Sequence, residues 1–124
     1  MTKVLLVDDE KEFVSALAER LALRGYAADW SVTAEDALAK VKAKEYDVCL
    51  LDMRMPRLSG LELKQEIKKT APCMRFIFLT GHGSEQWFEE ASSEGEFCLI
   101  KPVRVEQIME TIAEVIKEGK GGAA

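Results

Sequence analysis

Three aspartates follow two strongly apolar segments of the sequence, and their side chains could hold a metal ion. Asp8 and Asp9 come directly after the run VLLV at residues 4–7, and Asp52 comes directly after VCLL at residues 48–51. Strands buried on both faces of a parallel sheet have such continuous apolar sequences, and their carboxyl ends meet at one edge. Three carboxylates gathered there repel one another unless a cation compensates their charge. Because hard oxygen ligands favour Mg²⁺, with Mn²⁺ as the alternative, the sequence predicts a divalent metal site.

Two further polar residues follow other predicted strands. Thr80 comes after Ile77-Phe78-Leu79, and Lys101 comes after Leu99-Ile100. Each of these features is common on its own, but their joint occurrence at successive strand ends indicates one shared site. There Asp52 can act as a nucleophile on phosphorus and form an aspartyl phosphate. Such a transfer depends mainly on positioning and on neutralising the phosphoryl oxygens, which the metal, the Lys101 ammonium and the Thr80 hydroxyl would supply.

The elements that must position these residues alternate between strand and helix. Apolar runs predict strands at residues 4–7, 27–30, 46–51, 74–79 and 97–100. Helical spacing predicts helices between them, one ended by Gly25, one capped by Thr33 and one opened by a capping box at Ser59-Gly60-Leu61-Glu62. A weaker helix is predicted at 84–92, and the clearest one spans the apolar stripe between 105 and 116. This alternation predicts an α/β fold with a five-stranded parallel sheet, doubly wound with helices on both faces.

Composition places limits on the class of protein. The 124 residues suit one domain, predicted over 1–118, followed by a disordered tail over 119–124. Hydrophobic residues make up 48% and charged residues 31%, as in globular proteins, and no targeting segment or membrane-spanning run is seen. We therefore expect a cytoplasmic protein without a membrane partner. The net charge of −5 disfavours nucleic acid as a direct partner.

Five short motifs give the chain a recognisable relationship. They are VDDE at 7–10, LDMRMP at 51–56, SG at 59–60, LTGHG at 79–83 and KP at 101–102. Together they resemble a bacterial two-component response-regulator receiver domain of the chemotaxis-regulator-like type, and the resemblance covers residues 3–118. It implies a flavodoxin-like fold with strand order 2-1-3-4-5.

The resemblance also implies roles for particular residues. Asp52 would accept a phosphoryl group from a phosphohistidine on a sensor histidine kinase or a phosphotransfer protein. Asp8, Asp9, Asp52 and the backbone carbonyl of Arg54 would bind Mg²⁺. Lys101 would pair with Asp52 and then with the phosphoryl group, and its peptide bond to Pro102 would be cis.

Kinase docking and signal output are implied in the same way. The kinase would dock on the first helix, around Phe13 and Ala16, and on the loop at residues 102–104. Phosphorylation would draw Thr80 inward and remodel the surface of the fourth helix, the last strand and the fifth helix. That surface would bind a downstream protein or a second copy of the chain. Phosphate would act by favouring one state of a two-state equilibrium.

The sequence departs from the family at the last strand. An aromatic residue usually lies three positions before the lysine, but here that position holds Cys98 and the aromatic residue is its neighbour, Phe97. Adjacent strand residues point to opposite faces, so Phe97 cannot simply replace it. Either the strand carries a local shift or the aromatic toggle is absent.

Three other functions compete with a phosphoacceptor. A phosphatase of the haloacid-dehalogenase type needs its nucleophile on the first strand and an Asp two residues later; here Asp8 and Glu10 take these places, and Asp52 is left unexplained. A nucleotide-binding module needs a glycine-rich loop after the first strand, where the acidic residues would repel a pyrophosphate. A phosphorylation-independent interaction module remains the alternative. The complete set of site residues favours a phosphoacceptor that phosphorylates and dephosphorylates itself over a classical enzyme.

Overall fold

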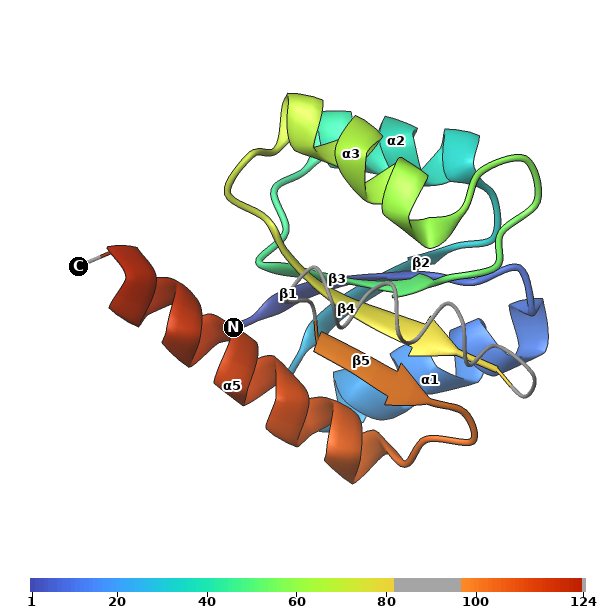
Figure 1. Ribbon diagram of the computed structural model, residues 1–124. Coiled ribbons are helices and arrows are strands. Elements are labelled where there is room, and N and C mark those ends of the chain that lie inside the picture. The colour runs from blue at the N-terminus through green and yellow to red at the C-terminus, as the bar shows by residue number, and fades with distance from the viewer. Residues whose placement is uncertain (82–96, 124) are drawn as a thin grey trace.

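A computed structural model gives the structure and describes residues 1–81 and 97–123. Five strands form one parallel sheet in the order β2-β1-β3-β4-β5, as the family resemblance implied (Figure 1). The strands are β1 (Lys3–Val7), β2 (Ala27–Ser31), β3 (Val48–Asp52), β4 (Arg75–Thr80) and β5 (Phe97–Ile100). The described helices are α1 (Lys11–Leu23), α2 (Ala34–Ala43), α3 (Gly60–Thr70) and α5 (Val105–Ala123). The helix predicted at 84–92 lies outside the described residues.

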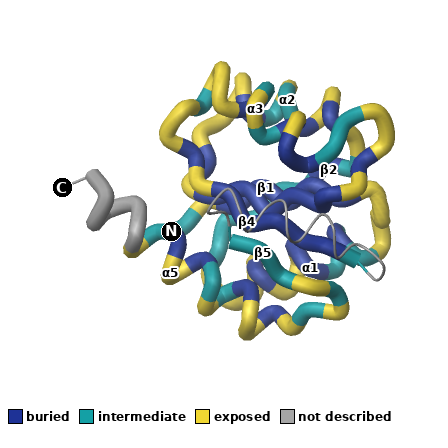
Figure 2. The backbone as a smooth tube through the Cα atoms, viewed as in Figure 1, coloured by how far each residue is buried: buried dark blue, intermediate teal, exposed yellow. Residues whose placement is uncertain are grey.

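The helices cover both faces of the sheet, so its central strands are buried. Helices α2 and α3 lie on one face and α1 and α5 on the other (Figure 1). Every residue of β3 is buried, and within β1 only its first residue, Lys3, is exposed. Figure 2 shows buried backbone along β1 and β4 at the centre of the molecule. Each face has its own apolar cluster, with Leu5, Leu51 and Phe78 under α2 and α3, and Leu6, Leu50 and Leu79 under α1 and α5. Alternation along each strand therefore supplies two cores, which confirms the doubly wound prediction.

Local sequence signals set the helix ends. The Thr33 side chain accepts a hydrogen bond from the Asp36 backbone N–H, 3.1 Å away, at the start of α2. Ser59 and Glu62 form the predicted capping box at the start of α3. Gly25 follows α1 with a φ of +92°, a left-handed conformation that favours glycine. The caps at Thr33 and Ser59 satisfy backbone groups that a helix leaves without partners, and they fix the turns into α2 and α3.

The last helix differs from the prediction at its end. A disordered tail was predicted over 119–124, whereas the backbone of α5 stays helical through Ala123. The helix is anchored by a buried apolar stripe that includes Ile108, Ile112 and Val115. Once such a helix is nucleated, each further residue adds one backbone hydrogen bond, so the helix can continue past its last buried contact. Within residues 1–81 and 97–123, none of the helices combines the length and the apolar sequence that a membrane span requires.

Candidate functional site

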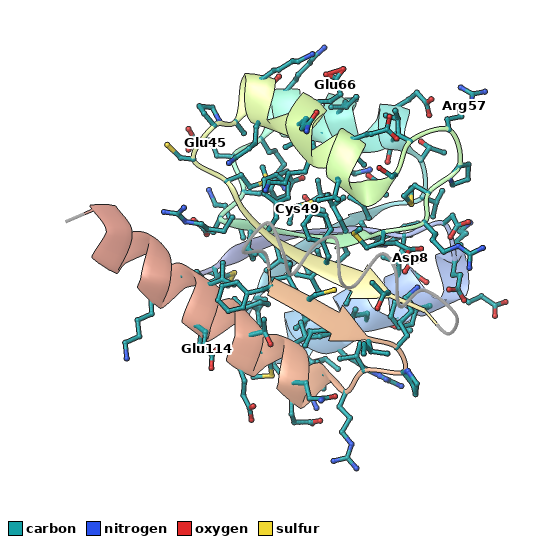
Figure 3. All side chains as sticks on the ribbon, viewed as in Figure 1. Asp8, Glu45, Cys49, Arg57, Glu66 and Glu114 are labelled. Atoms are coloured by element: carbon teal, nitrogen blue, oxygen red, sulfur yellow. The ribbon has the colours of Figure 1, made fainter. Side chains whose placement is uncertain are left out.

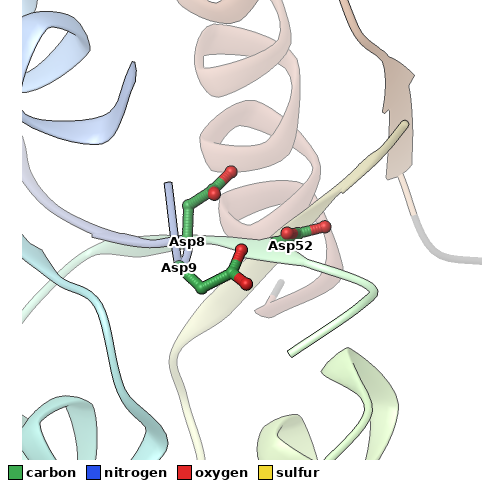
Figure 4. Close-up of side chains that lie close together, drawn as sticks. All are labelled: Asp8, Asp9 and Asp52. Atoms are coloured by element: carbon green, nitrogen blue, oxygen red, sulfur yellow. The ribbon is translucent and has the colours of Figure 1, made fainter. Parts of the chain in front are cut away.

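The predicted site residues meet at the carboxyl edge of the sheet. Asp8 and Asp9 follow β1, and Asp52 is the last residue of β3, which pairs with β1. Each of the three contributes a carboxylate oxygen to a group in which all such atoms lie within 4.8 Å of one another. Figure 4 shows these carboxylates close together, and Figure 3 places Asp8 at this edge while Cys49 lies inside the molecule. The juxtaposition predicted from two apolar runs is confirmed.

The surroundings of the Asp52 side chain disfavour its ionised form. Its residue is only 5% exposed, and burial, followed by the charge of Asp8, raises its pKa to about 6. The charge of Lys101 and a hydrogen bond from the Arg54 backbone N–H, 3.2 Å from Oδ1, act in the opposite direction. Burial likewise raises the pKa of Asp8, against hydrogen bonds from Lys101 and from the Glu10 backbone. The pocket therefore has a deficit of positive charge.

Within the described part of the chain, Lys101 contributes a positively charged side chain that contacts the carboxylates of this site. Its Nζ lies 2.6 Å from Asp8 Oδ2, 3.1 Å from Glu10 Oε1 and 3.7 Å from Asp52 Oδ2. Burial alone would lower the pKa of Lys101, but the hydrogen bond to Asp8 and the charges of Asp52 and Asp8 outweigh it and raise the pKa. The side chain is therefore an ammonium group at neutral pH. The Lys101–Pro102 peptide bond is cis, as the resemblance implied.

Thr80 ends β4 beside this group. It is buried, and its backbone carbonyl accepts a hydrogen bond from the Lys101 backbone N–H, with a donor–acceptor distance of 2.7 Å. The ends of β4 and β5 are thereby tied together next to the carboxylates. The sequence placed Thr80 at this edge correctly.

Comparisons with known proteins agree with this geometry. The family model for the response regulator receiver domain matches residues 4–113. The chain belongs to the response regulator receiver domain family. A receiver protein from Anaeromyxobacter sp. is 33% identical over 89% of this chain, and the transcriptional regulatory protein YesN of Bacillus subtilis is 31% identical over 97%. The chain spans 47% and 34% of these two relatives, respectively.

The fold of this receiver domain matches solved structures along almost its whole length. A receiver domain protein from Clostridium thermocellum superposes with a TM-score of 0.86 at 32% identity, and 97% of this chain and 98% of that one are covered. A CheY-like receiver domain protein from Methanospirillum hungatei gives a TM-score of 0.86 at 27% identity. The fold and the family identification therefore rest on independent comparisons.

The donor set of this receiver domain fits Mg²⁺. Three carboxylates with oxygen atoms within 4.8 Å of one another are hard ligands of the kind that this ion binds. Because burial and mutual repulsion raise the pKa of Asp52, a divalent cation would relieve an electrostatic cost that Lys101 offsets only in part. Arg54 lies next to Asp52, and its backbone N–H donates a hydrogen bond to Asp52 Oδ1.

The packing of β5 confirms that Phe97 does not replace the aromatic residue that the family usually has at the position of Cys98. Phe97 packs with the apolar cluster under α1 and α5, whereas Cys98 packs with the cluster under α2 and α3. Cys98 pairs with Phe78 in regular parallel register, so no local shift brings Phe97 to the other face. Burial raises the pKa of the Cys98 thiol, and a hydrogen bond with the Thr80 side chain opposes the rise. A thiol therefore contacts Thr80 at the place where the family usually has an aromatic ring.

Two further residues contact Lys101, and these contacts were not predicted from the sequence. The Glu10 carboxylate reaches Lys101, and the Phe13 ring lies with its centroid 4.8 Å from the Lys101 ammonium. The sequence placed Glu10 beside the aspartate pair and Phe13 on a docking helix, but their contacts with Lys101 join residues about 90 positions apart. The proximity of Glu10 to a strand end was the only signal that could have suggested its contact.

Proposed function

We propose that Asp52 of this receiver domain accepts a phosphoryl group from a phosphohistidine on a sensor histidine kinase or a phosphotransfer protein. The observation that supports this most strongly is the set of three clustered carboxylates with the Lys101 ammonium among them. Family membership supports a histidine kinase as the donor. The site residues are Asp52 as acceptor, Lys101 and Thr80 as its partners, and Asp8, Asp9, Asp52 and the Arg54 carbonyl as Mg²⁺ ligands.

The chemistry follows from the charges in the pocket. A carboxylate oxygen of Asp52 forms a bond to phosphorus while the phosphorus–nitrogen bond of the donor breaks, and the imidazole keeps the bonding electron pair. With a pKa of about 6, Asp52 is mostly ionised at neutral pH and can act as the nucleophile. Bound Mg²⁺ would supply positive charge to the phosphoryl oxygens. The Lys101 ammonium and the Thr80 hydroxyl would contact other oxygens of the same group.

Signal output would follow from a shift of Lys101 and Thr80 toward the new phosphoryl group. Thr80 ends β4 and contacts Cys98 on β5, so its displacement would reach the surface formed by β5 and α5. The residues predicted as a helix at 84–92, which the family resemblance assigns to this surface, lie outside the described residues. We propose that a downstream protein, or a second copy of the chain, binds there in the cytoplasm.

Cys98 favours a second candidate function. In the family, the position of Cys98 usually holds an aromatic residue that moves together with the threonine. Because β5 has a cysteine there, a receiver domain used as a phosphorylation-independent interaction module remains the alternative. In that case Mg²⁺ and a phosphoryl donor would leave the protein unchanged.

Intact mass spectrometry after incubation with acetyl phosphate separates these functions. One added phosphoryl group that requires Mg²⁺ and is absent from Asp52→Asn supports the proposal. Lys101→Ala should still bind Mg²⁺ but should not convert phosphorylation into a conformational change, as followed by NMR shifts of β5 and α5. No added mass, together with no binding of beryllium fluoride, would support the interaction module. Steady hydrolysis of a phosphomonoester would instead indicate a phosphatase.

A further inference from the structure

The Lys101 ammonium is enclosed by more groups than phosphoryl transfer needs. Asp8 and Asp52 belong to the acidic cluster, but Glu10 and Phe13 lie at the start of α1 and have no part in the proposed transfer. Glu10 Oε1 accepts a hydrogen bond from Lys101 Nζ at 3.1 Å, and the Phe13 ring centroid lies 4.8 Å from the same nitrogen. The lysine side chain is only 15% exposed within this enclosure.

The side chain of Glu10 is directed to the lysine instead of to its own helix. Glu10 is the N-cap residue of α1, a place where a side chain commonly accepts a hydrogen bond from the first helical turn, but it makes no such bond. Its backbone N–H donates to Asp8 Oδ1 at 2.9 Å, which fixes the turn between β1 and α1. The turn thus starts next to the acidic cluster, and the Glu10 carboxylate reaches Lys101 although its side chain is 65% exposed.

We propose that Glu10 is a positioning residue that retains Lys101 near Asp8 in the unphosphorylated domain and so opposes its transfer to a phosphoryl group on Asp52. The inference rests on the proposed function of Asp52. Lys101 Nζ is 3.7 Å from Asp52 Oδ2 but closer to both Asp8 and Glu10. To bind a phosphoryl oxygen, the ammonium must move toward Asp52 and weaken its contact with Glu10. A contact made only in the unphosphorylated state shifts the equilibrium toward that state.

The test compares Glu10→Gln with a matched control, Glu12→Gln. Glu12 is an exposed acidic residue in the first turn of α1, so its replacement removes the same charge from the same helix end without touching Lys101. At saturating Mg²⁺, we expect Glu10→Gln to accept a phosphoryl group from acetyl phosphate roughly 2- to 5-fold faster and to bind beryllium fluoride more tightly by a similar factor. Glu12→Gln should match the wild type in both measurements.

A double-mutant cycle identifies the route of the effect. In a Lys101→Ala background, Glu10→Gln should give no further change, because the contact that it removes is already lost. The proposal is overturned if Glu10→Gln matches Glu12→Gln, slows phosphorylation, or gives the same gain without Lys101. If one of these outcomes is found and the wild type is still phosphorylated, the proposal that Asp52 is the phosphoacceptor stands. A wild type that accepts neither phosphoryl group nor beryllium fluoride would overturn both.

Discussion

At the scale of single residues, the surroundings of Asp52 disfavour its ionised form, and the positive charge of Lys101 partly offsets this effect. Asp52 is buried beside Asp8, and these two causes raise its pKa to about 6. The same negative charge that makes Asp52 a nucleophile therefore costs folding free energy when no metal is bound. This conflict between stability and function is a property of functional sites in general.

The raised pKa predicts how stability depends on pH in metal-free protein. The unfolded chain releases the Asp52 proton near its ordinary value of 3.8, whereas the folded protein keeps it up to about 6. Between these values the folded state binds more protons, so the contribution of Asp52 to stability decreases as the pH rises. In EDTA at pH 7, Asp52→Asn should raise the free energy of unfolding by about 1–3 kcal/mol.

Urea unfolding of the two proteins at pH 4 and pH 7 measures this effect. The difference between Asp52→Asn and the wild type should be small at pH 4 and large at pH 7, since Asp52 is protonated in the folded protein at the lower pH. Carboxylates distant from the site titrate equally in both proteins and cancel, whereas the coupling of Asp8 to Asp52 is part of the measured difference. A variant that is less stable than the wild type at pH 7 would show that the Lys101 contact outweighs burial.

The clustering of the three aspartates was predictable from the sequence, but part of the surroundings of Lys101 was not. Asp8, Asp9 and Asp52 follow apolar runs, and strands of a parallel sheet bring such positions together. The contacts of Lys101 with Glu10 and Phe13 depend on side-chain rotamers and on the path of two loops. No spacing in the sequence reports either of these.

At the scale of elements, the turn from β3 to α3 sets the position of the acceptor. Ser59 and Glu62 cap α3, and the Gly60 backbone N–H donates to the Met53 carbonyl at 3.0 Å. A Cβ on Gly60 would lie 2.9 Å from the Asp52 carbonyl oxygen and 3.0 Å from the Met53 Cα. The helix therefore approaches the strand end so closely that only glycine fits.

Gly60→Ala tests this close approach. Since the opposing atoms belong to the backbone, they cannot move aside as a flexible side chain would, and we expect a loss of about 1–3 kcal/mol in the free energy of unfolding. Gln65→Ala, on an exposed position of the same helix, should change it by less than about 0.5 kcal/mol. Chemical denaturation of both variants is the measurement, and a Gly60→Ala protein as stable as its control would disprove the packing argument.

The helices and strands also show which structural features the sequence patterns could predict and which they could not. Local signals predicted the end of α1 at Gly25 and the starts of α2 and α3 at Thr33 and Ser59, because such signals act within a few residues. The tail predicted over 119–124 differs from the helical backbone that α5 has up to Ala123, since a helix anchored elsewhere can extend without core residues of its own. For Cys98, strand alternation correctly predicted a face opposite to Phe97 but gave no sign of the contact with Thr80.

At the scale of the whole molecule, the metal should contribute to the stability of the fold. The three carboxylates come from β1 and β3, so an ion held between them stabilises only the folded chain. Mg²⁺ at about ten times its dissociation constant should raise the free energy of unfolding by about 1.4 kcal/mol. The rise should be reduced in Asp9→Asn and retained in Glu114→Gln, an exposed acidic residue of α5. Equal Mg²⁺ dependence in both variants would argue against the site.

The global topology was predictable only in part from physical patterns. Alternating strands and helices predict a parallel sheet with helices on both faces, because parallel strands need crossover connections. That pattern does not specify the strand order, which came from the resemblance of VDDE, LDMRMP, LTGHG and KP to receiver domains. The observed order β2-β1-β3-β4-β5 agrees with it and brings β1 and β3 together at the site.

Chemical mapping of the phosphorylated residue tests the central claim most directly. Borohydride reduces an aspartyl phosphate to homoserine, so protein treated with acetyl phosphate and Mg²⁺, reduced and digested would carry a permanent mark at the acceptor. We expect homoserine at position 52, and at neither position 8 nor position 9. Homoserine at either of those positions, or an added phosphoryl group that leaves Asp52 unreduced, would contradict the assignment of Asp52 as the phosphoacceptor.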